Sequence, residues 1–187
     1  MTKTALTCGL FAGALSAIPA VAADDILARF KGGIGVIPVS SGVVPAAQNT
    51  TALTATDVNR NFVRGVQPAG QIWVIDKLDA KVQVNGHITV DGKGLILGGG
   101  NNAGRATGQS VFATLICDVP VTTPATPFTL SNTTLTGVQL TTTGDFKIDD
   151  MLSPAPQFPC PNPVLLIRTA GSGNWFATGI LRPSNDD

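Results

Sequence analysis

Residues Gln71 to Leu97 read QIWVIDKLDAKVQVNGHITVDGKGLIL, and this stretch decides the fold. It is the longest run of the chain in which apolar and polar residues alternate with a period of two. Side chains of a β-strand point alternately to the two faces of a sheet, so the run predicts strands with one buried face. An Asn-Gly pair inside the run marks a turn, which makes the stretch a β-hairpin.

Alternate residues of the run are predicted to form the buried face. These residues are Ile72, Val74, Leu78, Ala80, Val82 and Val84. Asp76 interrupts this row, which indicates a bulge or a polar contact there. Trp73 falls on the opposite face, where an exposed ring could stack on a sugar or dock a protein. In a sandwich, the same ring would instead cover the core near the end of a sheet.

The turn of the hairpin is predicted to contain three residues, Val84-Asn85-Gly86. This loop pairs Val82 with Ile88 and therefore apolar with apolar, and it places Gly86 in the left-handed conformation that such loops need. The two-residue loop that Asn-Gly usually signals would mix the faces, because a one-residue slip turns every side chain over. The three-residue loop also puts His87 on the polar face.

His87 is the only histidine, so it is the one candidate base for Ser-His-Asp hydrolysis. Ser110 lies in Gly108-Gln109-Ser110-Val111-Phe112, which is not the G-x-S-x-G of a nucleophile elbow. A solvated turn histidine is the expected role.

The first residues predict a secretory signal peptide over 1–23. Lys3 precedes a small, apolar run from Ala5 to Val21, and Ala20-Val21-Ala22 forms an A-x-A cleavage site. An N-terminal membrane anchor is the alternative, which the short run and the cleavage site disfavour. Residues 24–187 then form one exported domain, periplasmic or extracellular, without a transmembrane segment in the mature chain.

Composition excludes some partners and favours β structure. The chain has 12 Lys and Arg against 12 acidic residues, and the cations are scattered, which argues against binding nucleic acid or an anionic membrane. Every acidic residue is Asp, and Thr, Val, Gly and Pro are plentiful. Removing the signal peptide leaves Cys117 and Cys160, which predict one disulfide in an exported chain; a free catalytic thiol is the alternative.

The remaining pattern predicts about eight to ten short strands between Gly, Pro, Asn and Asp turns. Ser110–Cys117 reads as a central strand buried on both faces, and 164–168 with 175–181 reads as a hairpin. Two strands flank a bend at Gly32-Gly33, and a short helix near Ala55–Phe62 could lie within the long connection Ser40–Gly70. The fold class is all-β: a single-domain antiparallel β-sandwich with one disulfide, or alternatively a small β-barrel.

The loop Gly98–Gln109 (GGGNNAGRATGQ) is the main candidate for ligand binding. It lacks the Lys and hydroxyl of a phosphate-binding P-loop, so a surface loop is expected. Its polar side chains, together with the tryptophan noted above, form the predicted ligand-binding set. That set is Trp73, Asn101, Asn102 and Arg105.

Acidic residues provide the one cofactor hypothesis, a calcium site. Asp145, Asp149 and Asp150 are close in sequence, and calcium takes carboxylate oxygens as ligands, although no EF-hand spacing is present. Plain surface charge is the alternative. If the hairpin extends far enough, Asp79 and Asp91 become cross-strand neighbours; the ladder then ends sooner or a cation sits between them.

Several segments together resemble a family of small exported bacterial proteins of unknown function. They are FKGGIGVIPV, WVIDKLDAKVQVNGHITVDGKGLIL, GQSVFATLIC, GDFKIDDMLSP and PCPNPVLLIR with WFATGI. The resemblance covers most of the mature chain and implies a bacterial source and export. It implies no activity.

The sequence therefore predicts an exported, non-catalytic binding or structural module of the periplasm or cell surface. Its partner would be a cell-surface protein or a glycan, bound through loops such as Gly98–Gln109 and Ser40–Gly70. The alternative is an extracellular hydrolase with Asp-based chemistry, which would need a pair of carboxylates flanking one bond.

Overall fold

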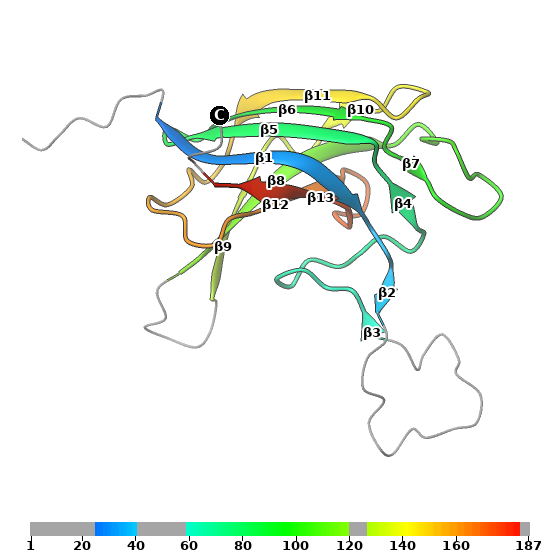
Figure 1. Cartoon of the computed structure of the whole chain (residues 1–187), viewed down its shortest axis with the longest axis horizontal. Coiled ribbons are helices and arrows are strands. Elements are labelled where there is room, and N and C mark those ends of the chain that lie inside the picture. The colour runs from blue at the N-terminus through cyan, green and yellow to red at the C-terminus, as the bar shows by residue number, and fades with distance from the viewer. Residues whose placement is uncertain (1–24, 41–58, 120–126, 184–187) are drawn as a thin grey trace, which may run out of the picture.

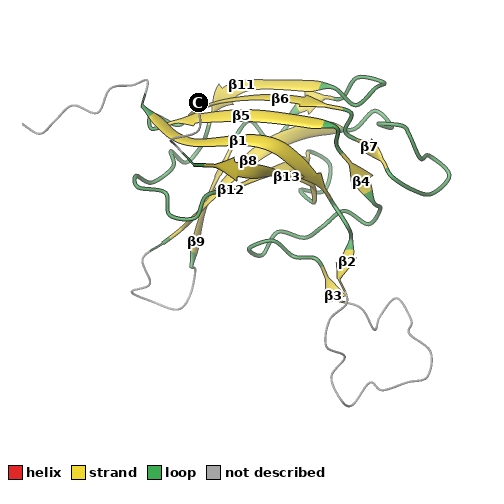
Figure 2. Ribbon diagram, in the orientation of Figure 1, coloured by secondary structure: helices red, strands yellow, loops and turns green. Residues whose placement is uncertain are grey.

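The structure, a computed structural model, describes residues 25–40, 59–119 and 127–183. Every regular element in these ranges is a β-strand (Figures 1 and 2), so the all-β prediction is confirmed. The predicted signal peptide at 1–23 lies outside the described residues. In chain order the strands are β1 (Ile26–Gly35), β2 (Val39–Ser40), β3 (Asn59–Arg60), β4 (Trp73–Val74), β5 (Lys77–Gln83), β6 (His87–Lys93), β7 (Ile96–Leu97), β8 (Ser110–Asp118), β9 (Phe128–Asn132), β10 (Val138–Gln139), β11 (Phe146–Met151), β12 (Val164–Thr169) and β13 (Trp175–Arg182).

One curled antiparallel sheet of nine strands makes the body of the fold. Its order is β10-β8-β12-β13-β1-β5-β6-β11, with β9 also paired to β8. In Figure 1 the strands β1, β5, β6 and β11 lie over β8, β12 and β13, which cross beneath them. The curl brings β10 and β11, at opposite ends of the order, near each other. The result is a half-barrel: one sheet supplies the two facing layers that enclose the core.

The β5–β6 hairpin follows the predicted register. Val82 pairs with Ile88 and Ala80 with Val90, and Gly86 has a φ of 90°, in the left-handed region. Both Val82 and Ile88 are fully buried. The three-residue turn is therefore confirmed.

Before Asp76 the predicted buried face is wrong. Trp73–Val74 form β4, which pairs with β7 in a separate two-stranded sheet, and the N–H of Asp76 then donates to the carbonyl of Lys93. Because the chain passes from one sheet to another at Asp76, the alternation of β5 does not extend back to β4. Ile72 and Val74 are accordingly exposed, whereas the Trp73 side chain covers the core and is 5% exposed.

The central strand is confirmed as predicted. β8 pairs with β12 on one side and with β9 and β10 on the other, and its residues 111–117 are buried on both faces. β12 and β13 form the predicted hairpin, in which Ile167 pairs with Ala177. Phe146 and Ile148 of β11 point into the core, as the alternation of that strand indicates.

Two local predictions near the start of the domain need correction. The segment around Gly32-Gly33 is one bulged strand, β1, rather than two strands, because the register with β13 shifts between Phe30 and Gly33. The helix expected near Ala55–Phe62 is contradicted at Asn59–Arg60, which form β3, since β2 offers that segment a strand partner. Asn61 and Phe62 are not helical either, and residues 55–58 lie outside the described residues.

The disulfide between Cys117 and Cys160 is confirmed, and it ties the end of β8 to the proline-rich loop. A polar cluster adjoins it: Arg64 forms an ion pair with Asp118 at 2.9 Å, and Asn162 donates to the same carboxylate at 2.7 Å. Disulfides persist in oxidising compartments, which fits an exported chain. In the ranges that the structure describes, no helix is long and apolar enough to cross a membrane.

Candidate functional site

A cup of about 420 Å³ opens where three loops meet beside β4, and we call it the amide cup. The loops are 69–71, 98–109 and the turn between β12 and β13. No charged residue belongs to its lining. Its polar lining consists of Gln71, Asn102, Thr107, Gln109, Thr169, Ser172 and Asn174.

Two stacked aromatic rings form the floor of the amide cup. Trp73 lies on Phe176 with ring centroids 4.0 Å apart and an angle of 13° between the ring planes. Leu97 of β7 completes the apolar part of the lining. All three side chains are buried in the core cluster, so the floor is rigid.

Backbone hydrogen bonds hold the walls of the amide cup. In the loop after β7, the N–H of Gly104 donates to Leu97 at 2.8 Å, and the N–H of Leu97 donates to Arg105 at 3.0 Å. In the β12–β13 turn, the N–H of Thr169 donates to Asn174 at 2.9 Å. The polar side chains are therefore presented from loops that are already shaped before a ligand arrives.

The structure brings only part of the predicted ligand-binding set together. Trp73 and Asn102 line the amide cup, whereas Asn101 and Arg105 are exposed on the same loop and outside the lining. Sequence reasoning missed Gln71 and Asn174, because they join the site from segments far apart in the chain. The one available signal was the Gly-Ser-Gly-Asn turn, which presents a polar amide beside a strand.

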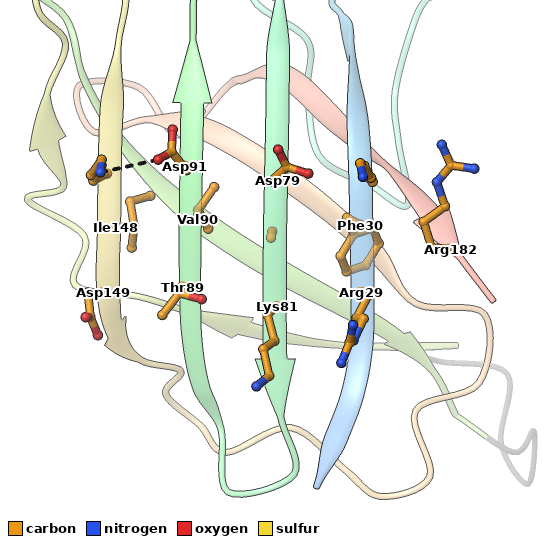
Figure 3. A pocket seen from close by; sticks show the side chains of 13 residues that line it. Arg29, Phe30, Asp79, Lys81, Thr89, Val90, Asp91, Ile148, Asp149 and Arg182 are labelled. Atoms are coloured by element: carbon orange, nitrogen blue, oxygen red, sulfur yellow. Dashed lines mark ion pairs between the residues drawn. The ribbon is translucent and has the colours of Figure 1, made fainter. Parts of the chain in front are cut away.

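A second depression, of about 790 Å³, lies on the outer face of β1, β5, β6 and β11, and we call it the charged hollow (Figure 3). It differs from the amide cup in being lined mostly by ionic groups. The charged lining residues are Arg29, Lys31, Asp79, Lys81, Asp91, Lys147, Asp149 and Arg182. Strand pairing arranges these side chains in two rows that run across the strands.

The first row reads Lys147, Asp91, Asp79 and Lys31 from β11 to β1. Asp79 and Asp91 are cross-strand neighbours, as expected if the hairpin extends that far, and the ladder continues past them to Lys77 and Lys93. Neighbouring lysines balance the two carboxylates. Lys147 lies 3.4 Å from Asp91 (Figure 3), and Lys77 lies 3.5 Å from Asp79.

The second row reads Asp149, Thr89, Lys81, Arg29 and Arg182 from β11 to β13. Four of these five side chains carry a charge. Three cations therefore stand on consecutive strands at one end of the row, and the single carboxylate stands at the other end.

His87 has a defined partner rather than only solvent. Its Nε2 lies 2.7 Å from Oδ1 of Asp149, and its side chain is 32% exposed. The backbone N–H of His87 donates to the side chain of Asn85 within the turn. A His–Asp pair of this kind orients an imidazole, but catalysis by nucleophilic attack also needs a serine or cysteine beside it.

The three aspartates of the calcium hypothesis contact three different partners. Asp145 accepts from the N–H of Gly94 at 3.1 Å, Asp149 contacts His87, and Asp150 accepts from the N–H of Thr134 at 2.8 Å. The hydrogen bonds from Thr134 lower the pKa of Asp150 below its usual value. Among the described residues, no group of three or more His, Cys or acidic side chains is placed to hold a metal ion.

No protein-family model, curated protein or solved structure matches this chain. The basis for assigning a function is therefore the geometry and chemistry of the two surface sites, since a fold by itself does not imply a function.

Proposed function

We propose that the chain is an exported, non-catalytic binding module whose amide cup takes a neutral glycan. The observation that carries the proposal is the lining of the cup: side-chain amides and hydroxyls, without a charged group, above the stacked rings of Trp73 and Phe176.

The chemistry of this lining matches that of a sugar. A side-chain amide has both donors and acceptors, and so does each hydroxyl group of a neutral sugar. Gln71, Asn102 and Asn174 can therefore bond a hydroxyl in either direction. The buried floor of Trp73, Phe176 and Leu97 closes the bottom of the cup, so the polar side chains of the walls supply the contacts to the ligand. A charged ligand would find no counter-ion among the lining residues.

The size and rigidity of the amide cup also favour a small ligand unit. Its volume of about 420 Å³ falls within the range of about 300–1,000 Å³ that is usual for small-molecule sites. Because backbone hydrogen bonds already hold its loops, ligand binding should cost little conformational entropy. The cup accommodates one or two sugar rings of a longer chain.

The disulfide and the expected signal peptide support a location in the periplasm or at the cell surface. Cys117 and Cys160 require an oxidising compartment to stay joined. Glycans of the cell wall or of other cells are abundant outside the inner membrane, so this location suits the ligand class.

The alternative, a hydrolase with Asp-based chemistry, has less support. Glycoside hydrolysis needs two carboxyl groups beside the scissile bond, one of them with a raised pKa. The amide cup has no carboxylate in its lining. The facing pair Asp79 and Asp91 lies in the charged hollow instead, with side chains 39% and 44% exposed and lysines beside them.

Binding of the oxidised chain to an array of neutral and acidic oligosaccharides tests the proposal. We expect binding to neutral members, and a loss of about tenfold in affinity for Asn102→Ala, which removes one hydrogen-bonding group. Asn101→Ala is the matched control, because Asn101 is the adjacent amide outside the lining. An array without neutral ligands, or equal losses in the two variants, would contradict the proposal.

A further inference from the structure

One side-chain amide in the wall of the amide cup is held in a fixed orientation. Gln109 lines the cup immediately before β8, and its side chain is half-buried. The hydroxyl of Thr169, at the end of β12, donates to Oε1 of this amide at 3.2 Å. Because the oxygen of the amide is bound to Thr169, the two N–H groups of Nε2 remain available to a ligand in the cup.

The environment of Thr169 sets this orientation. Thr169 is 4% exposed, and its hydroxyl oxygen accepts from the backbone N–H of Gly171 at 3.3 Å. A hydroxyl has one proton to donate, and within the described residues Gln109 is the acceptor that takes it. If the amide of Gln109 turned over, the hydroxyl would face two N–H donors, and its buried proton would lose its acceptor at a cost in free energy. Gln109 therefore acts as a hydrogen-bond donor towards the cup.

The other three amides of the cup are not fixed in this way. They belong to Gln71, Asn102 and Asn174, and no side-chain hydrogen bond orients them within the described part of the chain. Each of them can present its oxygen or its nitrogen to a ligand. The cup thus combines one fixed donor with amides that adapt. A ligand matches this arrangement best when it places an acceptor at Gln109.

We propose that the amide cup selects sugars that carry an acetamido group, and that Gln109 donates to the carbonyl oxygen of that group. This inference rests on the proposed glycan site and names its ligand class. An acetamido group is uncharged, which suits a lining without charged residues. Its carbonyl oxygen only accepts, and its N–H can donate to the amide oxygen of Asn102 or Asn174. A sugar hydroxyl that accepts from Gln109 must place its own proton elsewhere, so it is the weaker match.

Calorimetric titration of the oxidised chain with two matched trisaccharides tests the selectivity. One is a β-1,4-linked trimer of N-acetylglucosamine, and the other is the corresponding trimer of glucose, which has a hydroxyl in place of each acetamido group. We expect the acetamido trimer to bind about tenfold more tightly, because it satisfies the fixed donor and one of the adaptable amides together.

Gln109→Glu reverses the polarity of the fixed group at nearly constant shape. Its carboxylate still accepts from Thr169 but repels a carbonyl oxygen and accepts from a sugar hydroxyl. We expect affinity for the acetamido trimer to fall about tenfold, while affinity for the glucose trimer changes less than about threefold. Gln83→Glu, which makes the same change on β5 outside the lining, is the matched control.

Thr169 is a positioning residue in this account, and the ratio of the two affinities tests its role. Thr169→Val frees the amide of Gln109 to turn over, so the preference for the acetamido trimer should shrink, and Thr169→Ser should restore it. Equal affinities of the unaltered chain for the two trimers would overturn the acetamido inference and leave the neutral-glycan site standing. Binding of neither trimer would count against both. An acetamido preference that survives Gln109→Glu in a variant with an unchanged melting temperature would also overturn the inference.

Discussion

Trp73 of β4 stacks on Phe176 of β13, with ring centroids 4.0 Å apart. The stack joins the small β4–β7 sheet to the main sheet and at the same time forms the floor of the amide cup. A single aromatic contact thus connects the packing of the two sheets to the shape of the proposed ligand site.

Removal of this ring should destabilise the whole domain. Trp73 is buried, so Trp73→Ala leaves a cavity and should cost about 3–5 kcal/mol in the free energy of unfolding. Trp73→Phe keeps a ring on Phe176 and should cost less. Urea unfolding of both variants measures the difference. A cost below about 1 kcal/mol for the alanine variant would mean that the stack does not join the sheets.

The disulfide should supply a large share of the stability. Cys117 and Cys160 are 43 residues apart in sequence, and cross-linking a loop of that length is worth about 4 kcal/mol in the chain-entropy model. The double variant Cys117→Ala with Cys160→Ala should therefore unfold at a markedly lower urea concentration. Wild-type protein after reduction provides the control, and it should unfold near the double variant. Equal midpoints for the oxidised and reduced protein would contradict this expectation.

Asp150 of β11 contacts the loop after β9, and it should make the free energy of unfolding depend on pH. Hydrogen bonds from Thr134 lower its pKa in the folded state below the unfolded value of 3.8. Its contribution is therefore present above about pH 4 and is lost as the pH falls through the folded pKa.

Asp150→Asn should remove that acid-dependent step in urea unfolding measured from pH 2 to pH 6. Because the carboxylate is largely exposed to solvent, the loss at pH 6 should stay below about 1 kcal/mol. Asp25→Asn is a control carboxylate on an exposed segment at the start of the domain. An unchanged pH profile in the Asp150 variant would contradict the assignment.

The facing carboxylates Asp79 and Asp91 should interact with their neighbouring lysines through charge, and added salt should weaken this interaction. Lys147→Gln leaves Asp91 opposite Asp79 without its cation at 3.4 Å, and this should cost about 0.2–1 kcal/mol at low salt. The cost should vanish in about 1 M NaCl, where the Debye length is about 3 Å. A double-mutant cycle with Asp91→Asn measures the coupling. A coupling that persists at high salt would show that packing, and not charge, is responsible.

Local alternation predicted the elements of the main sheet well. The three-residue turn before His87 and the buried strand 111–117 follow from the order of apolar residues alone, because each depends on a single strand or on one adjacent pair. The disulfide followed from the two cysteines that remain when the predicted signal peptide is set aside.

The features that depend on distant pairing could not be predicted. The run before Asp76 looked continuous with β5, but β4 pairs with β7 in another sheet, so Trp73 points inward. The row containing Lys81 and Arg182 exists only because β1 lies between β5 and β13. The amide cup likewise draws Gln71 and Asn174 from loops that no local pattern connects.

The most direct test of the central claim is a map of amide chemical shifts. The ¹⁵N-labelled, oxidised chain would be titrated with a mixture of neutral oligosaccharides made of hexoses and N-acetylhexosamines. We predict shifts confined to residues 69–71, 100–109 and 170–174 and to the indole N–H of Trp73, around the amide cup. An unchanged spectrum, or shifts confined to β5 and β6 on the charged hollow, would contradict a neutral-glycan site in the amide cup.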